Sequence, residues 1–521
     1  MAFKLTYSTM FDPPEELHTR FDKSLAATAA KIGAYHPLFI DGRDVDGAGS
    51  VDNVSPIDGS VLGRFATANS AQVNDAFVAA QRAYPSWRAT DRGERIRLSR
   101  QVATIIEDRV YDIAATLCLE VGKNRLEALA ESQEAADFFR GYANDLERAR
   151  GFDTVLPNDP IPGVVSRNRS VLKPYGVWGV VAPFNFPLAL AAGPAAAALV
   201  TGNTVVLKGA TDTPWSVRLL ADCIRDAGYP RGVFNLVAGE GSEAGEALVS
   251  HPHLAGITFT GSYKVGMNIQ RRMQAGAYPR PCIAEMGGKN ACIVTEAANL
   301  DHAVSGIVRS AFGMGGQKCS ALSRVYVAEP VADLLLSKLL VAMRSLSIGD
   351  PTRRETWLGP VVSENAVSKY LSFADELGRH GGRILMGGTR LTVNGMSMGN
   401  FVAPTLATAP PEHPLYSIEM FLPIAMVARV AGLHAAVAHA NASDLGLTAG
   451  FYGSTAEAGY FLDNIEAGTT YVNRPQGATT GAWPWFQAFT GWKGSTSTGK
   501  AIGSSYYLPQ YLREQSQTVV Q

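Results

Sequence analysis

Short apolar, β-rich runs alternate with helical segments through the middle of the chain. The predicted strands lie at 177–182, 204–207, 234–237 and 257–260, and the helices that follow the first three end near residues 200, 227 and 250. Repeated strand–helix–strand units are typical of a doubly wound parallel sheet. The pattern therefore predicts an α/β fold built around such a sheet.

Helical spacing of apolar residues dominates the chain before residue 150. It predicts one helix at 71–87 and a second around Leu98, Val102 and Ile105. The most apolar window, 188–200, is rich in alanine and shorter than the ~20 residues that cross a bilayer, so it is expected to form a buried helix.

The remaining pattern divides the chain further. Residues 150–170 are rich in proline and polar residues and are expected to be an extended arm or linker. A second α/β region begins near Cys282 and runs to about residue 451, with a strand at 291–295 and a helix at 331–346, and a late strand lies beyond it at 470–473. The β-prone end, 516–520, would form an exposed sheet edge unless the arm or another subunit pairs with it.

Composition and charge exclude several classes of partner. The 521 residues carry 46 Lys+Arg against 47 Asp+Glu, so neither nucleic acid nor a membrane surface is an expected partner. Five cysteines without a CxxC pair indicate a reducing, cytoplasmic compartment, and the first 23 residues lack the apolar core of an export signal. His251 and His253 lack a third metal ligand and are interpreted as surface histidines, so no metal is expected.

Glycines follow two of the predicted strands, where a helix begins. Gly239, Gly241 and Gly245 follow the strand at 234–237, and Gly261, Ser262 and Gly266 follow the strand at 257–260. Such turns let backbone N–H groups approach a phosphate at a helix N-terminus, although glycine serves equally well in a plain tight turn. Neither turn completes a GxGxxG motif.

Three short segments carry candidate chemistry. Cys319 lies in the small-residue turn GGQKCSA, which can expose a thiol beside backbone N–H groups, whereas the other four cysteines are expected to be buried apolar residues. Glu285 ends a predicted strand before a glycine pair. Asn185, in PFNFP, lies where a strand gives way to a helix, a place suited to a hydrogen-bond donor or simply to a helix cap.

Taken together, these segments resemble the aldehyde dehydrogenase superfamily from about Leu38 onward. PFNFP, GNTVVLK, FTGS, EMGGKN, GGQKCSA and EMFLP occur in the family's order, and Glu285 precedes Cys319 by the family's usual interval. The resemblance implies an NAD(P)-binding domain from 1–149 and 171–281, a catalytic domain from 282–480, and a small β oligomerisation arm from 150–170 and 505–521. It also implies a homodimer or higher homo-oligomer.

The resemblance also implies the catalytic roles. Cys319 would attack a small-molecule aldehyde to give a thiohemiacetal, whose oxyanion is held by the Asn185 amide and the Cys319 N–H. Hydride then leaves for the nicotinamide, and Glu285 activates the water that hydrolyses the thioester. Hydrolysis to a free acid is expected because relatives that transfer the acyl group to coenzyme A or phosphate generally lack this base.

Cofactor contacts follow from the same resemblance. Lys208 and Glu419 would bind the ribose hydroxyls, Gly261 and Ser262 the pyrophosphate, and Phe421 would support the nicotinamide. The remaining predicted cofactor contacts are Thr211 and Gly241. The acid of the family's Pro-x-Glu is missing after Lys208, where the chain reads Gly209-Ala210-Thr211, so NAD is expected and NADP stays possible, with Lys264 as a further cation and Asp212 as a replacement acid.

Further motifs are similar to the Δ1-pyrroline-5-carboxylate dehydrogenase branch, which oxidises L-glutamate γ-semialdehyde to L-glutamate in proline catabolism. In that branch the positions of Ser320, Gly481 and Ala482 receive the substrate α-carboxylate. Phe186 and Phe489 are the other expected substrate contacts. Glu120, in EVGKN, would either handle protons near the site or be a surface acid paired with Lys123.

Departures from the family pattern support a second hypothesis. Leu422 and Thr490 stand where the family has glycine, and Trp483 and Trp485 add bulk to the loop after Ala482. An aldehyde dehydrogenase for an aromatic or longer aliphatic aldehyde would account for this bulk. A third hypothesis is a binding or structural protein without turnover, but the intact set of Cys319, Glu285, Asn185 and Lys208 argues against it.

Overall fold

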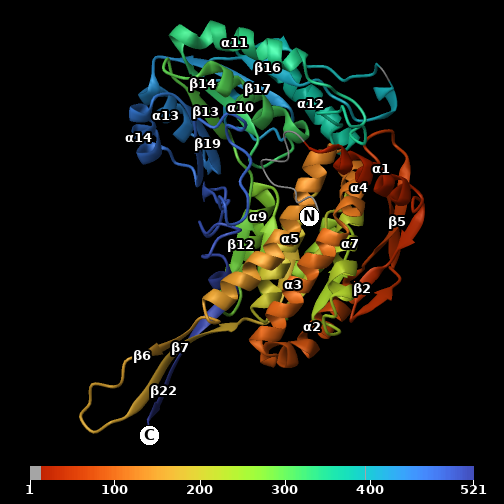
Figure 1. Cartoon of the computed structure of the whole chain (residues 1–521), viewed down its shortest axis with the longest axis vertical. Coiled ribbons are helices and arrows are strands. Elements are labelled where there is room, and N and C mark those ends of the chain that lie inside the picture. Colours follow the sequence, from red (N-terminus) through yellow and green to blue (C-terminus); the bar gives the residue numbers. More distant parts are fainter. Residues whose placement is uncertain (1–12, 394, 521) are drawn as a thin grey trace.

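The computed structural model describes residues 13–393 and 395–520 (Figure 1). Residues 1–12, on which the expectation of no export signal partly rests, lie outside the described residues. Two seven-stranded sheets and a smaller three-stranded ribbon organise the molecule. The described helices include none that is both long enough and apolar enough to cross a membrane.

The first sheet has the order β12-β11-β8-β9-β10-β2-β3. Its first five strands are parallel, and the last two run antiparallel to their neighbours. The strands are β2 (Leu38–Ile40), β3 (Arg43–Val45), β8 (Val177–Val181), β9 (Thr204–Lys208), β10 (Phe234–Val237), β11 (Leu254–Thr260) and β12 (Cys282–Glu285). The predicted doubly wound sheet is therefore confirmed.

Helices cover both faces of this sheet because successive side chains of a strand point to opposite sides. In β9, Val205 and Leu207 join the core cluster of α3, α5 and α6, whereas Val206 joins the cluster of α2. The alanine-rich window forms the buried helix α6, as predicted. The helices are α1 (Glu15–Ala29), α2 (Ser70–Ala89), α3 (Arg92–Asp108), α4 (Val110–Val121), α5 (Arg125–Arg148), α6 (Ala189–Val200), α7 (Pro214–Asp226), α8 (Glu246–Ser250) and α9 (Tyr263–Gln274), beside a small sheet of β1 (Ala34–His36), β5 (Val61–Thr67) and β4 (Gly49–Val54).

The second sheet has the order β15-β16-β17-β14-β13-β19-β20, and only its edge strand β15 is antiparallel. Its strands are β13 (Asn290–Val294), β14 (Leu322–Ala328), β15 (Arg383–Met386), β16 (Thr405–Thr408), β17 (Ile424–Val430), β19 (Thr448–Tyr452) and β20 (Thr469–Val472). Its helices are α10 (Leu300–Phe312), α11 (Glu329–Arg344), α12 (Glu364–Leu377), α13 (Leu433–Asn441) and α14 (Thr455–Asn464).

Two expected boundaries of the second region need correction. Residues 282–285 form β12, which pairs with β11 at the edge of the first sheet, so the second sheet begins only with β13. The second region also continues past residue 480, because β21 (Trp492–Lys493) pairs with β18 (Leu445–Gly446). Both pairings join segments that are far apart in sequence or lie on the other sheet, so periodicity along the chain does not reveal them.

The proline-rich segment and the end of the chain form a three-stranded antiparallel ribbon that leads away from the rest of the molecule (Figure 1). It consists of β6 (Asp153–Leu156), β7 (Ser166–Pro174) and β22 (Leu512–Val520), with β7 in the centre. β22 pairs with β7 along its whole length, from Leu512 opposite Pro174 to Val520 opposite Ser166. The partner of the β-prone end is therefore the arm of the same chain.

The order of strands determines where a site can form. Lys208 and Glu285 end β9 and β12, and the loops that leave the carboxyl ends of β8, β10 and β11 carry Asn185, Gly241 and Gly261. Cys319 and Glu419 precede β14 and β17 and so lie at the amino ends of the second sheet. Because only four residues separate β12 from β13, these two edges meet, and the crevice lies where open parallel sheets bind ligands.

Candidate active site

The turn that carries Cys319 is shaped by three left-handed residues in succession. Met314, Gly315 and Gly316 have φ of 53°, 64° and 66° after α10. A Cβ on Gly316 would lie 2.3 Å from the carbonyl oxygen of Leu422, so glycine is required there. The turn leaves Cys319 partly exposed in a pocket, while the other four cysteines are buried as predicted.

Burial and nearby acids hold Cys319 in its thiol form. Burial together with the carboxylates of Glu419 and Glu285 raises the pKa of Cys319 to about 12, although the backbone N–H groups of Ser320 and Cys319 favour the thiolate. A thiol with such a pKa becomes a nucleophile only when a neighbouring group accepts its proton. The site therefore needs a base close to the sulfur.

Glu285 ends β12 and lines the same pocket. One carboxylate oxygen accepts a 3.2 Å hydrogen bond from the Thr496 hydroxyl, and the other has no hydrogen-bond partner in the described chain. Burial raises the pKa of Glu285 to about 8. A carboxyl group with this pKa can accept a proton from water or thiol near neutral pH and release it again.

Asn185 lies in the loop between β8 and α6 and is buried. Its Nδ2 donates a 3.0 Å hydrogen bond to the carbonyl of Gln317, two residues before Cys319. The amide carries a second hydrogen, and this contact fixes it beside the cysteine turn. The structure thus brings together the three residues predicted to be catalytic.

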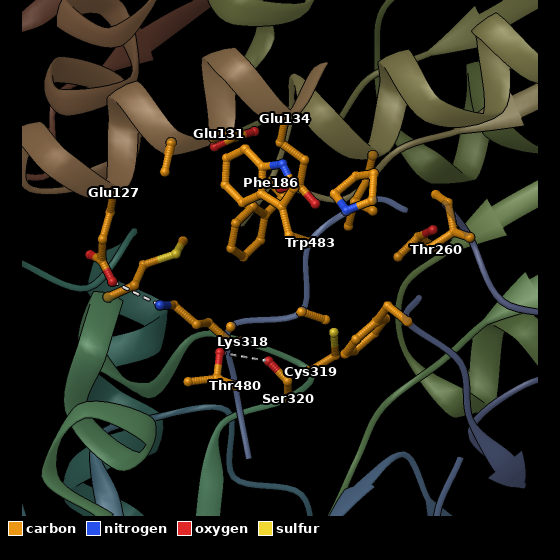
Figure 2. Close-up of a pocket in the computed structure, with 18 of the residues that line it drawn as sticks. Glu127, Glu131, Glu134, Phe186, Thr260, Lys318, Cys319, Ser320, Thr480 and Trp483 are labelled. Atoms are coloured by element: carbon orange, nitrogen blue, oxygen red, sulfur yellow. Dashed lines mark hydrogen bonds and ion pairs between the residues drawn. The ribbon is translucent and has the colours of Figure 1, made fainter. Parts of the chain in front are cut away.

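The predicted substrate contacts gather around Ser320. Its hydroxyl donates a 3.2 Å hydrogen bond to the Thr480 hydroxyl, directly before Gly481 and Ala482 (Figure 2). All of these residues line the pocket, as do Phe186 and Phe489. The predicted substrate residues therefore line one pocket, with Ser320 beside Cys319 and Phe186 on the side of α5.

Arg474 orients the loop that carries Thr480 and Gly481, and it was not predicted as a site residue. Its guanidinium donates to the carbonyls of Thr480 at 3.4 Å and Gly481 at 3.2 Å. Because N–H and C=O of a trans peptide point in opposite directions, the N–H groups of Gly481 and Ala482 are directed away from Arg474. Gly481 and Ala482 line the pocket, so Arg474 fixes the main chain of this loop at the pocket wall.

Helix α5 contributes charged residues that the motifs did not reveal. Glu127, Glu131 and Glu134 line the pocket opposite the cysteine turn (Figure 2). Glu131 forms a buried ion pair with Lys123, and Glu127 pairs with Lys318 at 2.7 Å. Glu134 makes no such pair among the described residues, and burial beside Glu131 raises its pKa to about 8. Their spacing of four and three residues on one helix face was the available signal.

Both interpretations of Glu120 were wrong. Its side chain is fully buried, lies outside the pocket, and accepts backbone hydrogen bonds from Trp215 at 2.9 Å and Ser216 at 2.8 Å. It therefore caps the N-terminus of α7, and burial raises its pKa to about 7. Lys123 pairs instead with Glu131 and places its ammonium 3.4 Å from the ring centroid of Phe186.

The bulk expected in the pocket is mostly elsewhere. Leu422 is buried behind the cysteine turn, and Thr490 bonds through its N–H to the Thr469 hydroxyl at 3.1 Å. Neither lines the pocket, and neither does Trp485. Only Trp483 of these four residues reaches the pocket wall, because the loop turns sharply after Pro484.

The predicted cofactor residues lie along the meeting edges of the two sheets. Glu419 accepts a 2.9 Å hydrogen bond from the Gly288 N–H, and a Cβ on Gly287 would lie 2.0 Å from its carboxylate, so this cradle excludes any side chain. Phe421 has φ of 58° and contacts Phe184 edge-on. Gly261 and Ser262 form the turn into α9 after β11.

Lys208 and its neighbours form the other end of the predicted cofactor site. Its buried ammonium donates 2.9 Å to the adjacent Gly209 carbonyl, and Thr211 donates 3.1 Å to the Gly239 carbonyl. Gly241 begins a single π-helical turn that leads directly into α8, so a helix begins there as predicted. Burial lowers the pKa of Lys208, whereas the acids Glu240 and Asp212 raise it, so two carboxylates accompany this lysine.

One histidine interpretation also needs correction. His251 is buried, stacks on Phe77 with ring centroids 3.9 Å apart and contacts Asn74, because it follows α8 directly. Burial lowers its pKa to about 4. His253 is exposed as expected. Within residues 13–393 and 395–520, no cluster of three histidine, cysteine or acidic residues could hold a metal.

Comparisons with known proteins agree with this geometry. The profile of the aldehyde dehydrogenase family matches residues 44–517. The 1-pyrroline-5-carboxylate dehydrogenase of Geobacillus thermodenitrificans is 35% identical over 506 residues, 96% of this chain and 95% of the relative. A second relative, 1-pyrroline-5-carboxylate dehydrogenase 2 of Bacillus subtilis, is 35% identical over 507 residues, 96% of this chain and 95% of its own.

Solved structures show the same similarity. A 1-pyrroline-5-carboxylate dehydrogenase from Thermus, crystallised with bound NAD, has a TM-score of 0.92 at 33% identity and is covered completely, as is this chain. The family and the branch expected from the motifs are both confirmed. With its sheets, its cysteine turn and nearly all of its length in agreement, the chain belongs to the aldehyde dehydrogenase family.

Proposed function

We propose that this protein oxidises L-glutamate γ-semialdehyde to L-glutamate with NAD as the hydride acceptor. The observation that carries the proposal is the contact of the Ser320 hydroxyl with Thr480, which joins the residue after the nucleophile to the Gly481-Ala482 loop. Converging hydroxyl and N–H donors suit a small carboxylate. The named relatives act on 1-pyrroline-5-carboxylate, the cyclic form of this semialdehyde, which supports the same substrate.

The charged residues of α5 support an amino-acid substrate. A semialdehyde of this kind carries an α-ammonium as well as an α-carboxylate. Glu134 offers a carboxylate on the pocket wall without an ion pair of its own, whereas Glu127 and Glu131 are neutralised by Lys318 and Lys123. Binding of a cation would lower the raised pKa of Glu134 and keep it ionised.

The chemistry follows from the three catalytic residues. The Cys319 sulfur attacks the carbonyl carbon as its proton passes to Glu285, and the oxyanion is held by the Cys319 N–H and the Asn185 amide. Bound NAD supplies an acceptor for the hydride that leaves this carbon. Glu285 then releases the thiol proton to solvent and takes a proton from water, whose oxygen attacks the thioester carbon. Collapse of this adduct breaks the carbon–sulfur bond and releases the acid, and Glu285 returns its proton to the Cys319 thiolate.

NAD fits the residues that would hold it. The Glu419 cradle against Gly287 and Gly288 can accept hydrogen bonds from ribose hydroxyls, and Lys208 can donate to them. Asp212 and Glu240 beside Lys208 would repel the 2′-phosphate of NADP. These acids favour NAD and take over from the missing family glutamate.

One observation favours a different aldehyde. Trp483, Phe186 and Phe489 make much of the pocket apolar, which suits an aromatic or longer aliphatic aldehyde. The decisive comparison is kcat/KM for L-glutamate γ-semialdehyde, hexanal and benzaldehyde, each with NAD. We expect kcat/KM to be highest for the semialdehyde, whereas a higher value for benzaldehyde or hexanal would overturn the substrate proposal.

Ser320→Ala tests the carboxylate contact itself. Loss of one hydrogen bond to a charged group is expected to raise KM for the semialdehyde about tenfold and to leave kcat/KM for propanal within about twofold. Ser504→Ala, on a partly exposed serine outside the pocket, serves as the matched control. Equal losses with both aldehydes would show that Ser320 does not recognise the carboxylate.

The raised pKa of Glu285 predicts the pH dependence of hydrolysis. Water activation needs the carboxylate, and burial raises its pKa to about 8, so the rate of thioester hydrolysis should rise between about pH 6.5 and 9. Thr496→Ala removes the hydroxyl that stabilises the carboxylate, so it should move the midpoint to higher pH. Stopped-flow measurement of NADH release after the first turnover checks both. A flat profile would contradict Glu285 as the base.

We also infer a cytoplasmic homo-oligomer. All five cysteines are free thiols, in keeping with a reducing compartment. The ribbon of β6, β7 and β22 exposes Val155, Val519 and Val520, and its outer strands have open edges. A second copy of the chain would cover these edges.

A further inference from the structure

The loop after Ala482 makes a tight turn that is anchored on α5. Trp483 and Gln487 exchange backbone hydrogen bonds of 3.1 and 2.9 Å, which closes a five-residue turn immediately after Gly481-Ala482. Trp485 at its tip has φ of 60°, a left-handed conformation that is unfavourable for a bulky residue. Such strain persists only where surrounding contacts determine the conformation.

Those contacts come from a slot on α5. A Cβ on Gly141 would lie 2.1 Å from the Trp485 indole, so the slot exists only because residue 141 has no side chain. The indole packs edge-on against Tyr142 and Phe138, with centroids 5.1 and 6.4 Å away. Its N–H donates a 2.9 Å hydrogen bond to Asp145. Glycine within a helix is itself unfavourable. The packing of the Trp485 ring therefore requires two locally unfavourable features, the glycine at 141 and the left-handed backbone of Trp485.

The backbone of Trp485 is held as well. Its N–H donates 2.9 Å to the Gly503 carbonyl, and the Gly503 N–H donates 3.0 Å to the Tyr142 hydroxyl. Tyr142 thus supports both the ring and the main chain of Trp485. The tip of the loop is therefore fixed to α5 from two directions.

Trp483 makes a second attachment on the same helix. Its indole N–H donates a 2.9 Å hydrogen bond to Asp137, two helical turns before Asp145. Its ring forms part of the pocket wall, on the α5 side facing the cysteine turn (Figure 2). One tryptophan therefore fixes the loop outside the pocket, and the other closes the pocket itself.

We propose that Trp485, seated in the Gly141 slot, is a positioning residue that holds Gly481 and Ala482 at the distance needed for the substrate carboxylate, and that Trp483 limits substrate length. The identity of the carboxylate substrate rests on the proposed function. The loop has attachments on both sides, since Arg474 holds its carbonyls and α5 holds its tip. Its donors are consequently rigid before substrate arrives.

Gly141→Ala tests the slot without touching the pocket. The new methyl group would displace the Trp485 ring, so KM for L-glutamate γ-semialdehyde should rise about tenfold with kcat/KM for propanal within about twofold. Asn144→Ala, on the exposed face of the same helix, is the matched control. Equal effects on both aldehydes, or none on either, would overturn the positioning role.

A double variant separates displacement of the ring from general damage to α5. Phenylalanine at 485 lacks the indole ring that meets Gly141, so Gly141→Ala should add less than about twofold to the KM of Trp485→Phe. A full additional tenfold loss in the double variant would show that Gly141→Ala acts through the helix alone.

Hydrogen–deuterium exchange supplies a readout that needs no turnover. Backbone amides of residues 480–487 should exchange faster in Gly141→Ala than in Asn144→Ala, with α10 unchanged in both. If the wild-type protein failed to prefer the semialdehyde, the proposed function would be wrong. The exchange result would still test whether Trp485 in the Gly141 slot holds the loop in place. Unchanged exchange of residues 480–487 would overturn the positioning role of Trp485, whichever aldehyde is the substrate.

Trp483→Ala tests the length limit. Removing the indole from the wall should raise kcat/KM for hexanal about tenfold relative to propanal. An unchanged ratio of hexanal to propanal would show that Trp483 does not limit substrate length.

Discussion

A Glu285→Gln variant is expected to release one equivalent of NADH per active subunit and then almost stop. Glutamine keeps the shape of the side chain and its contact with Thr496 but cannot take a proton from water. Acylation of Cys319 would be slower than in the wild type, because the amide cannot accept the thiol proton, and it would consume one substrate. Hydrolysis would slow about 1,000-fold. Stopped-flow absorbance would show the burst, and mass spectrometry of the quenched protein would show the thioester on Cys319.

Two observations would count against this assignment. Steady turnover of the variant above about 10% of the wild-type rate would require a different base. A loss of the burst itself would mean that Glu285 is needed chiefly to deprotonate Cys319, whose raised pKa makes that step demanding. Glu246→Gln, which alters an exposed acid on α8, is the control for handling and folding.

Cys319→Ala is expected to abolish aldehyde oxidation, with a loss of about 10,000-fold or more, because no other group in the pocket can form the thioester. Binding of NAD should persist, since Lys208 and Glu419 are unchanged, and quenching of protein fluorescence would measure it. Cys223→Ala, in the buried core, is the matched control and should keep its activity. Activity in Cys319→Ala would overturn the mechanism.

The catalytic geometry was largely predictable because short motifs mark where strands end. Lys208 and Glu285 end parallel strands and Asn185 follows one, so the alternation of strands and helices already placed them at one edge. Cys319 needed only its small-residue turn to be recognised. These features are local in sequence, and local patterns are what a sequence displays.

Features that depend on packing between distant segments were not predictable in the same way. Glu120 follows an ordinary helical pattern, and only the fold brings the N-terminus of α7 against it. His251 is buried because Phe77, far away in sequence, stacks on it. The size of Trp485 suggested a crowded pocket. Its ring instead packs outside the pocket against Gly141 of α5, where the lack of a side chain leaves room for it.

The acids of α5 fall between these cases. Glu127, Glu131 and Glu134 recur with helical spacing, so the sequence shows that they share a face. Which neighbours that face meets is a tertiary property. The ion pairs with Lys123 and Lys318 distinguish Glu131 and Glu127 from Glu134, which has no such pair among the described residues.

The central strand of the ribbon has a consequence for synthesis of the chain. β7 pairs with β6 soon after both emerge, but its other edge must wait for β22, which follows more than 300 residues later at Leu512–Val520. At typical translation speeds of 5–20 residues per second, the wait is roughly 20–70 s. Arg167, Arg169 and Lys173 lie on this waiting strand, and Arg169 pairs with Asp153 of β6. Positive charge on an open strand edge disfavours its pairing with the same edge of a second copy.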